Sequence, residues 1–241
     1  MKSLQSVPAI KGDVPGRRGP RARLARAVRR VARAVAGRVG RWAGLATLGA
    51  ALLLPACTIL PKAEPLDVYL LPASAAVPAT ATQVAPWSLR IARPAAGVHL
   101  SGQRIVVVPE DNRVSVYTGA GWSDPAPVLV RNRLLDAFRV DGRVAALSSD
   151  DRQLQADFEL DSDLRAFQSE YRDGRAEAVL RLDARLVHTA TRRIVASRSF
   201  ALRAPATDTA VPAVVQAFGA AADRLAAEVV EWTVREGSAA K

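Results

Sequence analysis

Two alternating segments in the second half of the chain constrain the fold most. Within residues 178–188 an apolar side chain stands at every second position from Ala178 to Leu186, with charged side chains among the positions between them. Residues 194–202 resume an alternating pattern after the polar stretch HTATRR. Because successive side chains of a strand point to opposite faces, this spacing predicts an antiparallel hairpin with one apolar face. Another element must cover that face.

A long helix at the C-terminal end is expected to supply the cover. Within residues 209–236 apolar side chains recur at alternating spacings of four and three, at Val211, Val215, Phe218, Ala222, Leu225, Val229 and Trp232. This spacing is typical of an amphipathic helix, and we favour packing on the sheet over a coiled-coil seam.

A second helix is predicted within residues 121–138. Four residues share its apolar face: Val130, Leu134, Ala137 and Phe138. Three polar residues lie off that face: Arg131, Arg133 and Asp136. Ser123 or Asp124 would cap the first turn, and Pro125 would stand where its missing N–H costs nothing.

Five further segments are predicted to be extended: 68–71, 87–94, 103–110, 112–119 and 157–171. Among these segments, residues 103–110 (QRIVVVPE) are apolar enough for burial on both faces of the sheet. The apolar phase of 157–171 shifts between Leu164 and Phe167, which predicts a bulge. The sum is an α+β fold, a single sheet of about five to seven strands with two main helices packed on one face.

Few residues are arranged for catalysis. His99 and His188 are the only histidines, and neither has a cysteine or carboxylate at metal-ligand spacing. We expect His188, at the hairpin end, to be exposed. The sequence contains no GxSxG motif. The glycines of TGAGWSD, residues 118–124, lack the lysine and the spacing of a P-loop, and predict a strand-to-helix turn.

Two other groups of residues are interpreted structurally. Acidic side chains alternate along one predicted strand, at Asp157, Glu159, Asp161 and Asp163. They lack the glycine and pattern of an EF-hand loop, so we interpret them as a solvated strand face rather than a calcium or catalytic site. Trp122 and Trp232 are interpreted as core anchors. We therefore expect no enzymatic activity, no cofactor and no metal.

The basic charge of the chain is confined to its leader. Twelve of the 34 Lys and Arg residues precede Cys57, but only one of the 23 acidic residues does. From Cys57 onward 22 basic and 22 acidic residues cancel, so the formal net charge of +11 belongs to the leader. This distribution argues against a nucleic-acid partner.

The only cysteine follows an apolar run directly. Residues 42–54 are mostly apolar and follow Arg38 and Arg41, as in an export signal, and the run is shorter than the roughly 20 residues of a spanning helix. Residues 54–57, LPAC, resemble the lipobox of bacterial lipoproteins. That resemblance implies diacylglycerol on Cys57, cleavage by signal peptidase II between Ala56 and Cys57, and acylation of the new amino group, typically with palmitate. A buried core thiol is the alternative.

The mature chain also resembles the ABC-type transport auxiliary lipoproteins. The resemblance lies in the order of VYLLPA, RIVVVPEDNRVSVYTGAGWSDPAPVLVRNRLLDAF, DFELDSDLRAFQSEY, AVLRLDARLVHTATRRIVASRSFAL and VPAVVQAFGAAADRLAAEVVEW after Cys57. It implies four parts: residues 1–56, a signal peptide; 57–66, a lipid-anchored tether; 67–236, the auxiliary domain; and 237–241, a tail. The leader is long, and translation from Val31 or Val39 is a further hypothesis.

The family implies a non-enzymatic accessory subunit. Its expected partners are an ABC permease, its ATPase and a mammalian-cell-entry (MCE) domain substrate-binding protein, which move lipids between membranes. Thr58, where an aspartate would signal inner-membrane retention, favours the inner leaflet of the outer membrane, facing the periplasm. Direct lipid binding and homo-oligomer formation stay open. The alternative is an assembly lipoprotein of an envelope secretion or lipopolysaccharide export machine.

Overall fold

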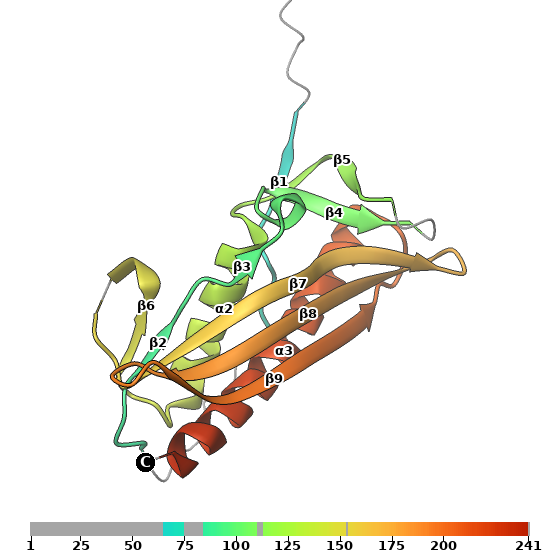
Figure 1. The fold of residues 1–241 in the computed structure, drawn as a ribbon. Helices are drawn as coiled ribbons and strands as arrows, with labels where there is room; N and C mark the ends of the chain where they lie inside the picture. The colour runs from blue at the N-terminus through green and yellow to red at the C-terminus, as the bar shows by residue number, and fades with distance from the viewer. Residues whose placement is uncertain (1–64, 75–83, 110–112, 153, 241) are drawn as a thin grey trace, which may run out of the picture. The chain divides into compact units, whose positions relative to one another are not determined.

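The computed structural model describes residues 65–74, 84–109, 113–152 and 154–240, which belong to one compact unit (Figure 1). Its elements in chain order are β1 (Asp67–Tyr69), β2 (Leu89–Ile91), β3 (Ala95–Ala96), η1 (Val98–Leu100), β4 (Arg104–Val108), β5 (Ser115–Trp122), α2 (Ala126–Asp141), β6 (Leu147–Ser149), η2 (Asp150–Arg152), β7 (Phe158–Arg172), β8 (Arg175–His188), β9 (Arg193–Pro205) and α3 (Val211–Ala239).

β7 is the strand around which the sheet is organised. One edge pairs antiparallel with β8 along its whole length, from Phe158 opposite His188 to Arg172 opposite Arg175. The other edge pairs in parallel with three short strands in succession, β2 at its start, β3 in the middle and β4 at its end. The predicted bulge is confirmed, because the β7–β8 register shifts between Leu164 and Ala166.

The predicted hairpin of β8 and β9 is also confirmed. Its register runs continuously from Glu177 opposite Pro205 to Leu186 opposite Ala196, and the even-numbered residues of β8 from 176 to 186 are buried. The turn between β7 and β8 is Asp173–Gly174, with φ of 49° and 72° at the two residues. Positive φ at both positions is what a two-residue hairpin turn needs to match the twist of the strands.

β5 extends further than the sequence predicts. Residues 118–122, interpreted as part of a turn, belong to the strand, and its last three residues pair in parallel with β1. Gly121 allows a close approach here, because a Cβ at that position would lie 3.0 Å from the Gln103 carbonyl oxygen. The same carbonyl accepts a hydrogen bond from the Trp122 N–H at 2.6 Å.

α2 begins without the predicted cap. Pro125 is the N-cap residue rather than the first helical residue, and no side chain bonds the first turn. Ser123 Oγ donates to Asp124 instead, at 3.1 Å. Pro127 in the first turn removes one amide that would need a partner. The helix ends at Gly142, whose φ of 73° gives the left-handed conformation common after a helix.

Both helices cover the same face of the sheet, as predicted (Figure 1). α3 packs on β8 and β9 and contacts α2 beside it. Trp122 is 1% exposed and meets Phe167 and Phe218 with ring centroids 5.7 and 5.2 Å away. Trp232 packs against Phe200 at 5.8 Å. Both tryptophans are therefore core residues, which confirms the interpretation from the sequence.

The α+β class is confirmed, but the described residues form a sheet of nine strands rather than five to seven. The two additional strands are β3 and β6, of two and three residues. Strands of this length are too short to show a period in sequence. β3 pairs with the much longer β7, and β6 pairs with β2, which β7 holds in place on its other edge.

Gly237→Val is expected to destabilise the fold by about 1–3 kcal/mol. A Cβ at Gly237 would lie 2.7 Å from the buried ring of Trp87, which Phe158 supports on another side at a centroid distance of 5.4 Å. Urea unfolding of the full-length protein would measure the effect. Gly102→Val is the control, since nothing lies within 4 Å of a Cβ there. Equal stability of the two variants would contradict the packing of Trp87 on α3.

Candidate functional site

One ion pair joins the two helices to the segment that follows β1. Arg133 of α2 and Asp223 of α3 form the pair, with side chains 11% and 26% exposed. Arg133 Nη2 also donates to the carbonyl oxygens of Leu71, at 3.0 Å, and Pro72. The Ser74 N–H donates to Asp223 Oδ2 at 2.9 Å. This Arg133–Asp223 clamp fixes the segment against both helices.

Gly219 lets the clamped segment lie directly on α3. A Cβ at this position would stand 2.8 Å from the Pro72 carbonyl oxygen and 3.0 Å from Pro72 Cβ. Glycine inside a helix costs roughly 1 kcal/mol relative to alanine. The close passage of the chain is the physical reason for a glycine here.

A groove of about 580 Å³ lies between α2 and α3, beside the clamp. Its apolar lining comes from five residues of the helices and two of the clamped segment: Ala137, Val140, Ala226, Ala227, Val230, Leu71 and Ala73. Its charged lining comes from Arg133, Asp136, Asp141, Arg143, Asp223 and Glu231. A groove with apolar walls and a few charged groups accepts an apolar chain or side chain of a ligand.

The charged groups of this groove are mostly engaged with one another. Arg143 Nε donates to Asp141 at 2.9 Å, and Arg143 Nη2 donates to Glu231 at 2.8 Å. Hydrogen bonds to these two carboxylates raise the pKa of Arg143 above its ordinary value. A charged ligand would have to displace an existing pair to bind, so the groove favours apolar over ionic ligands.

The predicted polar face of α2 is buried at two positions, which corrects the expectation from the sequence. Besides Arg133, Arg131 is only 7% exposed. Arg131 Nη1 contacts Asp150 at 3.0 Å and Asp151 at 2.6 Å. Burial by itself lowers the pKa of Arg131, but hydrogen bonds to Asp150 and Asp151 outweigh it and raise the pKa. Arg131 thereby ties α2 to η2.

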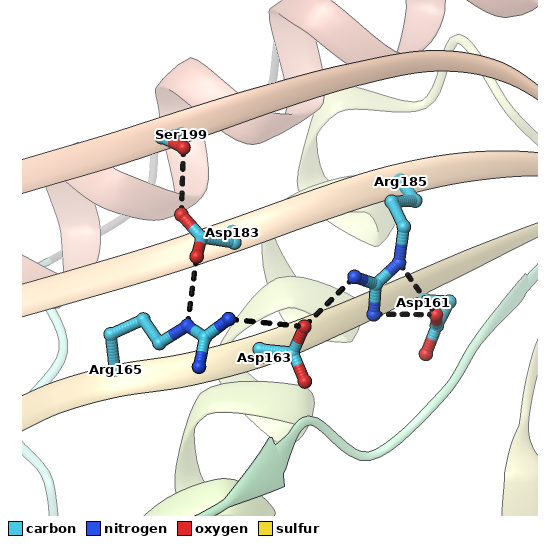
Figure 2. Close-up of polar contacts among 6 residues, drawn as sticks. All are labelled: Asp161, Asp163, Arg165, Asp183, Arg185 and Ser199. Carbon is cyan, nitrogen blue, oxygen red and sulfur yellow. Dashed lines mark hydrogen bonds and ion pairs between the residues drawn. The ribbon is translucent and has the colours of Figure 1, made fainter.

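A ladder of alternating charges crosses the sheet face that the helices leave open (Figure 2). It comprises six residues of β7, β8 and β9: Asp161, Asp163, Arg165, Asp183, Arg185 and Ser199. Arg185 bridges Asp161 and Asp163, each at 2.8 Å. Arg165 Nε lies 2.8 Å from Asp183, and Ser199 Oγ donates to the other oxygen of that carboxylate at 2.7 Å.

The ladder favours the charged forms of Asp183 and Arg185. Hydrogen bonds from Ser199 and Arg165 lower the pKa of Asp183. Hydrogen bonds to Asp163 and Asp161 raise the pKa of Arg185. General acid–base catalysis requires a group whose pKa lies near the working pH. These shifts move both groups away from neutral pH, so the ladder is suited to holding strands in register and presenting a polar surface.

The acidic stripe at the start of β7 and just before it lies on a partly exposed face, as interpreted from the sequence, and its side chains are also paired there. Glu159 forms an ion pair with Arg90. Asp157 Oδ2 accepts hydrogen bonds from the N–H and Oγ of Ser88, each at 2.8 Å. Within the described ranges, no group of three or more His, Cys, Asp or Glu side chains is placed to hold a metal ion.

The structure places the remaining predicted residues apart from these features. His99 is exposed in η1. His188 is half buried rather than exposed, because its ring meets Phe158 edge-on at 5.4 Å. Cys57 and Ala56 lie outside the described residues. None of the helices in the described part of the chain is long and apolar enough to cross a membrane.

The described residues form an α+β unit. Its clusters of ionisable side chains are paired with one another, and the segment that follows β1 is held against two helices by the Arg133–Asp223 clamp. The chain belongs to the family of ABC-type transport auxiliary lipoprotein components, which it matches over residues 69–230. The match confirms the resemblance seen in the sequence. It also identifies the chain as a lipoprotein component associated with ABC transport. A lipoprotein family of this kind points to the cell envelope as the location.

The chain is also similar to individual proteins. The crystal structure of protein XCC0632 from Xanthomonas campestris has a TM-score of 0.66 at 32% identity, with 71% of this chain and 96% of that chain covered. A crystal structure of an uncharacterized protein shares the fold, with a TM-score of 0.55 at 18% identity over 70% of this chain and 98% of the other. The uncharacterized protein bll6063 of Bradyrhizobium diazoefficiens is 35% identical over 61% of this chain, which spans 39% of that protein's length.

Asp223→Ala is expected to lower the free energy of unfolding by about 1–3 kcal/mol, because it leaves the mostly buried guanidinium of Arg133 without its carboxylate. Chemical denaturation of the full-length protein is the measurement. Asp136→Ala is the matched control, since it breaks an exposed pair with Arg139 and should cost about 0.5 kcal/mol or less. A loss no larger than that of the control would show that the clamp contributes nothing to stability.

The contribution of Asp183 to stability is expected to vary with pH in a defined direction. Because its pKa is lowered by folding, this contribution is complete above the ordinary carboxyl pKa and is lost as the pH falls through the lowered value. The difference in unfolding free energy between the natural protein and Asp183→Asn should therefore be constant between about pH 7 and 5 and shrink below about pH 4. A difference that does not change with pH would rule out the ladder as its source.

Proposed function

We propose that this protein is the accessory subunit of an ABC-type intermembrane lipid transport system that contains an MCE-domain protein. In this proposal acyl chains on Cys57 anchor it in the inner leaflet of the outer membrane, with the folded unit facing the periplasm. The observation that carries the proposal is the match to the ABC-type transport auxiliary lipoprotein family over residues 69–230. The lipobox LPAC at residues 54–57 supports the anchor.

The proposed role is positional rather than chemical. Burial of acyl chains contributes about 0.8 kcal/mol per CH₂ group, and several chains together give a stable anchor. Ten residues separate Cys57 from Asp67, the first residue of β1, so the tether can span at most about 35 Å. The Arg133–Asp223 clamp fixes the chain just after β1 and thereby limits how far the folded unit can move from the anchor.

No reaction is proposed for this chain. The carboxylates of the ladder are held by arginines, and the two described histidines lie on separate elements, η1 and β8. A subunit of this kind acts by binding partners, the MCE-domain protein, the permease and the ATPase. The groove between α2 and α3 and the open face of the sheet are the surfaces available to them.

Purification of the tagged full-length protein from mild-detergent extracts of the native envelope is expected to recover the MCE-domain protein and both ABC subunits, identified by mass spectrometry. The Cys57→Ser variant is the control for the anchor. It should leave the outer-membrane fraction, because no thiol remains for diacylglycerol. Recovery of a secretion or lipopolysaccharide export machine in place of the transporter would refute the transport role. A variant that stays in the outer membrane would refute only the anchor.

A further inference from the structure

The outer edge of β9 presents backbone groups that no other strand of the described residues uses. β9 is the last long strand on its side of the sheet, and among the described strands it pairs only with β8 (Figure 1). The Ala206 N–H donates to the Ala176 carbonyl oxygen at 2.9 Å. In the register of the β8–β9 pair, the N–H and C=O groups of the even-numbered residues of β9 therefore point toward β8. N–H and C=O groups of alternate residues point to opposite edges of an antiparallel strand. The backbone of the odd-numbered residues therefore points outward.

α3 closes one end of this edge. The guanidinium of Arg224 donates to the carbonyl oxygen of Arg203, one of the outward-facing residues. Ser197, Ser199 and Ala201 remain, and their side chains are small and exposed. They offer three N–H and three C=O groups in a row about 14 Å long. We name Ser197, Ser199 and Ala201 the β9 edge.

Four of the usual backbone obstacles to strand addition are missing from the β9 edge in the described part of the chain. Natural sheets protect exposed edges with proline, bulges, short strands or covering elements. The one register shift in β9 lies before it, between the pairs of Leu186 and Val187, and its only proline is the last residue, Pro205. An edge left straight and uncovered in this way can accept an extended segment as a further strand.

The charge around the β9 edge indicates what kind of segment fits. Between Asp183 and Asp208 the sequence contains no acidic residue, while arginines occur at five positions: Arg185, Arg192, Arg193, Arg198 and Arg203. Among the described residues Arg192 and Arg193 have no ion-pair partner, and both are exposed. Arg198 reaches Glu228 only at 3.7 Å. Arg185 and Arg203 also pair with carboxylates of neighbouring strands, so the unmatched positive charge is that of Arg192 and Arg193, at the turn before the β9 edge. That charge favours an acidic partner.

We propose that the β9 edge is a docking site for an extended acidic segment of a partner protein, which adds to the sheet as a strand beside β9. Backbone hydrogen bonds to Ser197, Ser199 and Ala201 provide the register. Arg192 and Arg193 bind carboxylates at the end of the segment near the β8–β9 turn. The proposal stands on the geometry of β9 and does not depend on which transport system the protein serves.

A synthetic peptide in which glutamate alternates with valine and threonine tests this proposal. With the full-length protein in detergent micelles, it should slow amide hydrogen exchange in fragments that cover β9. Fluorescence anisotropy of the labelled peptide should show binding that weakens about tenfold or more in Ala201→Pro, which removes an outward N–H and blocks the edge sterically. Ala201→Ser keeps the amide and should bind like the natural protein.

Charge variants keep the test decisive if Ala201→Pro does not fold. The double variant Arg192→Glu/Arg193→Glu should also weaken binding about tenfold or more, since two attractions become repulsions. The matched control Arg139→Glu/Arg152→Glu changes the net charge equally on other elements and should have no effect. The lysine version of the peptide should not bind. Binding that is unchanged in both β9 variants, or no protection of β9, would overturn the proposal. Protection that rises with protein concentration alone would assign the edge to a second copy and overturn it too.

Discussion

The pairing of β7 with β8 over their whole lengths is the interaction on which the rest of the structure depends. It places one edge of β7 against a long antiparallel neighbour and leaves the other edge free for three short parallel strands. Those short strands could not form a sheet alone, because two or three residues bury too little apolar surface. The bulge at Arg165 adjusts the phase of β7, so that buried side chains before and after it, Leu164 and Phe167, both serve the core.

The two faces of this sheet differ in composition and in what covers them. The helices cover one face, and Trp122, Phe167 and Phe218 form an aromatic cluster beneath them. The open face is polar, yet its charges are matched in pairs, as in the bridge of Arg185 between two carboxylates (Figure 2). Matched charge on an open face keeps it soluble without creating a strong field that attracts unrelated partners.

The family assignment and the surfaces of this chain are both compatible with the proposed accessory role. The Arg133–Asp223 clamp fixes the segment after β1, because that segment is bonded to both helices at once. The groove between α2 and α3 lies beside the clamp, and the β9 edge lies on the opposite side of the sheet from β1 in strand order. A partner strand at the β9 edge would therefore engage the unit without disturbing the clamped segment.

The sequence by itself determined the elements whose periods are long enough to read: the β8–β9 hairpin, the bulge in β7 and the amphipathic face of α3. The Asp–Gly turn and the aromatic core residues are equally local signals. Only the tertiary structure decided that β2, β3 and β4 share one edge of β7, because parallel pairing joins residues far apart in the chain. It also decided the burial of Arg131 and Arg133. The sequence around these arginines does not indicate that Asp150 and Asp223 are their ion-pair partners. The side chains of each pair come together only after the helices have packed.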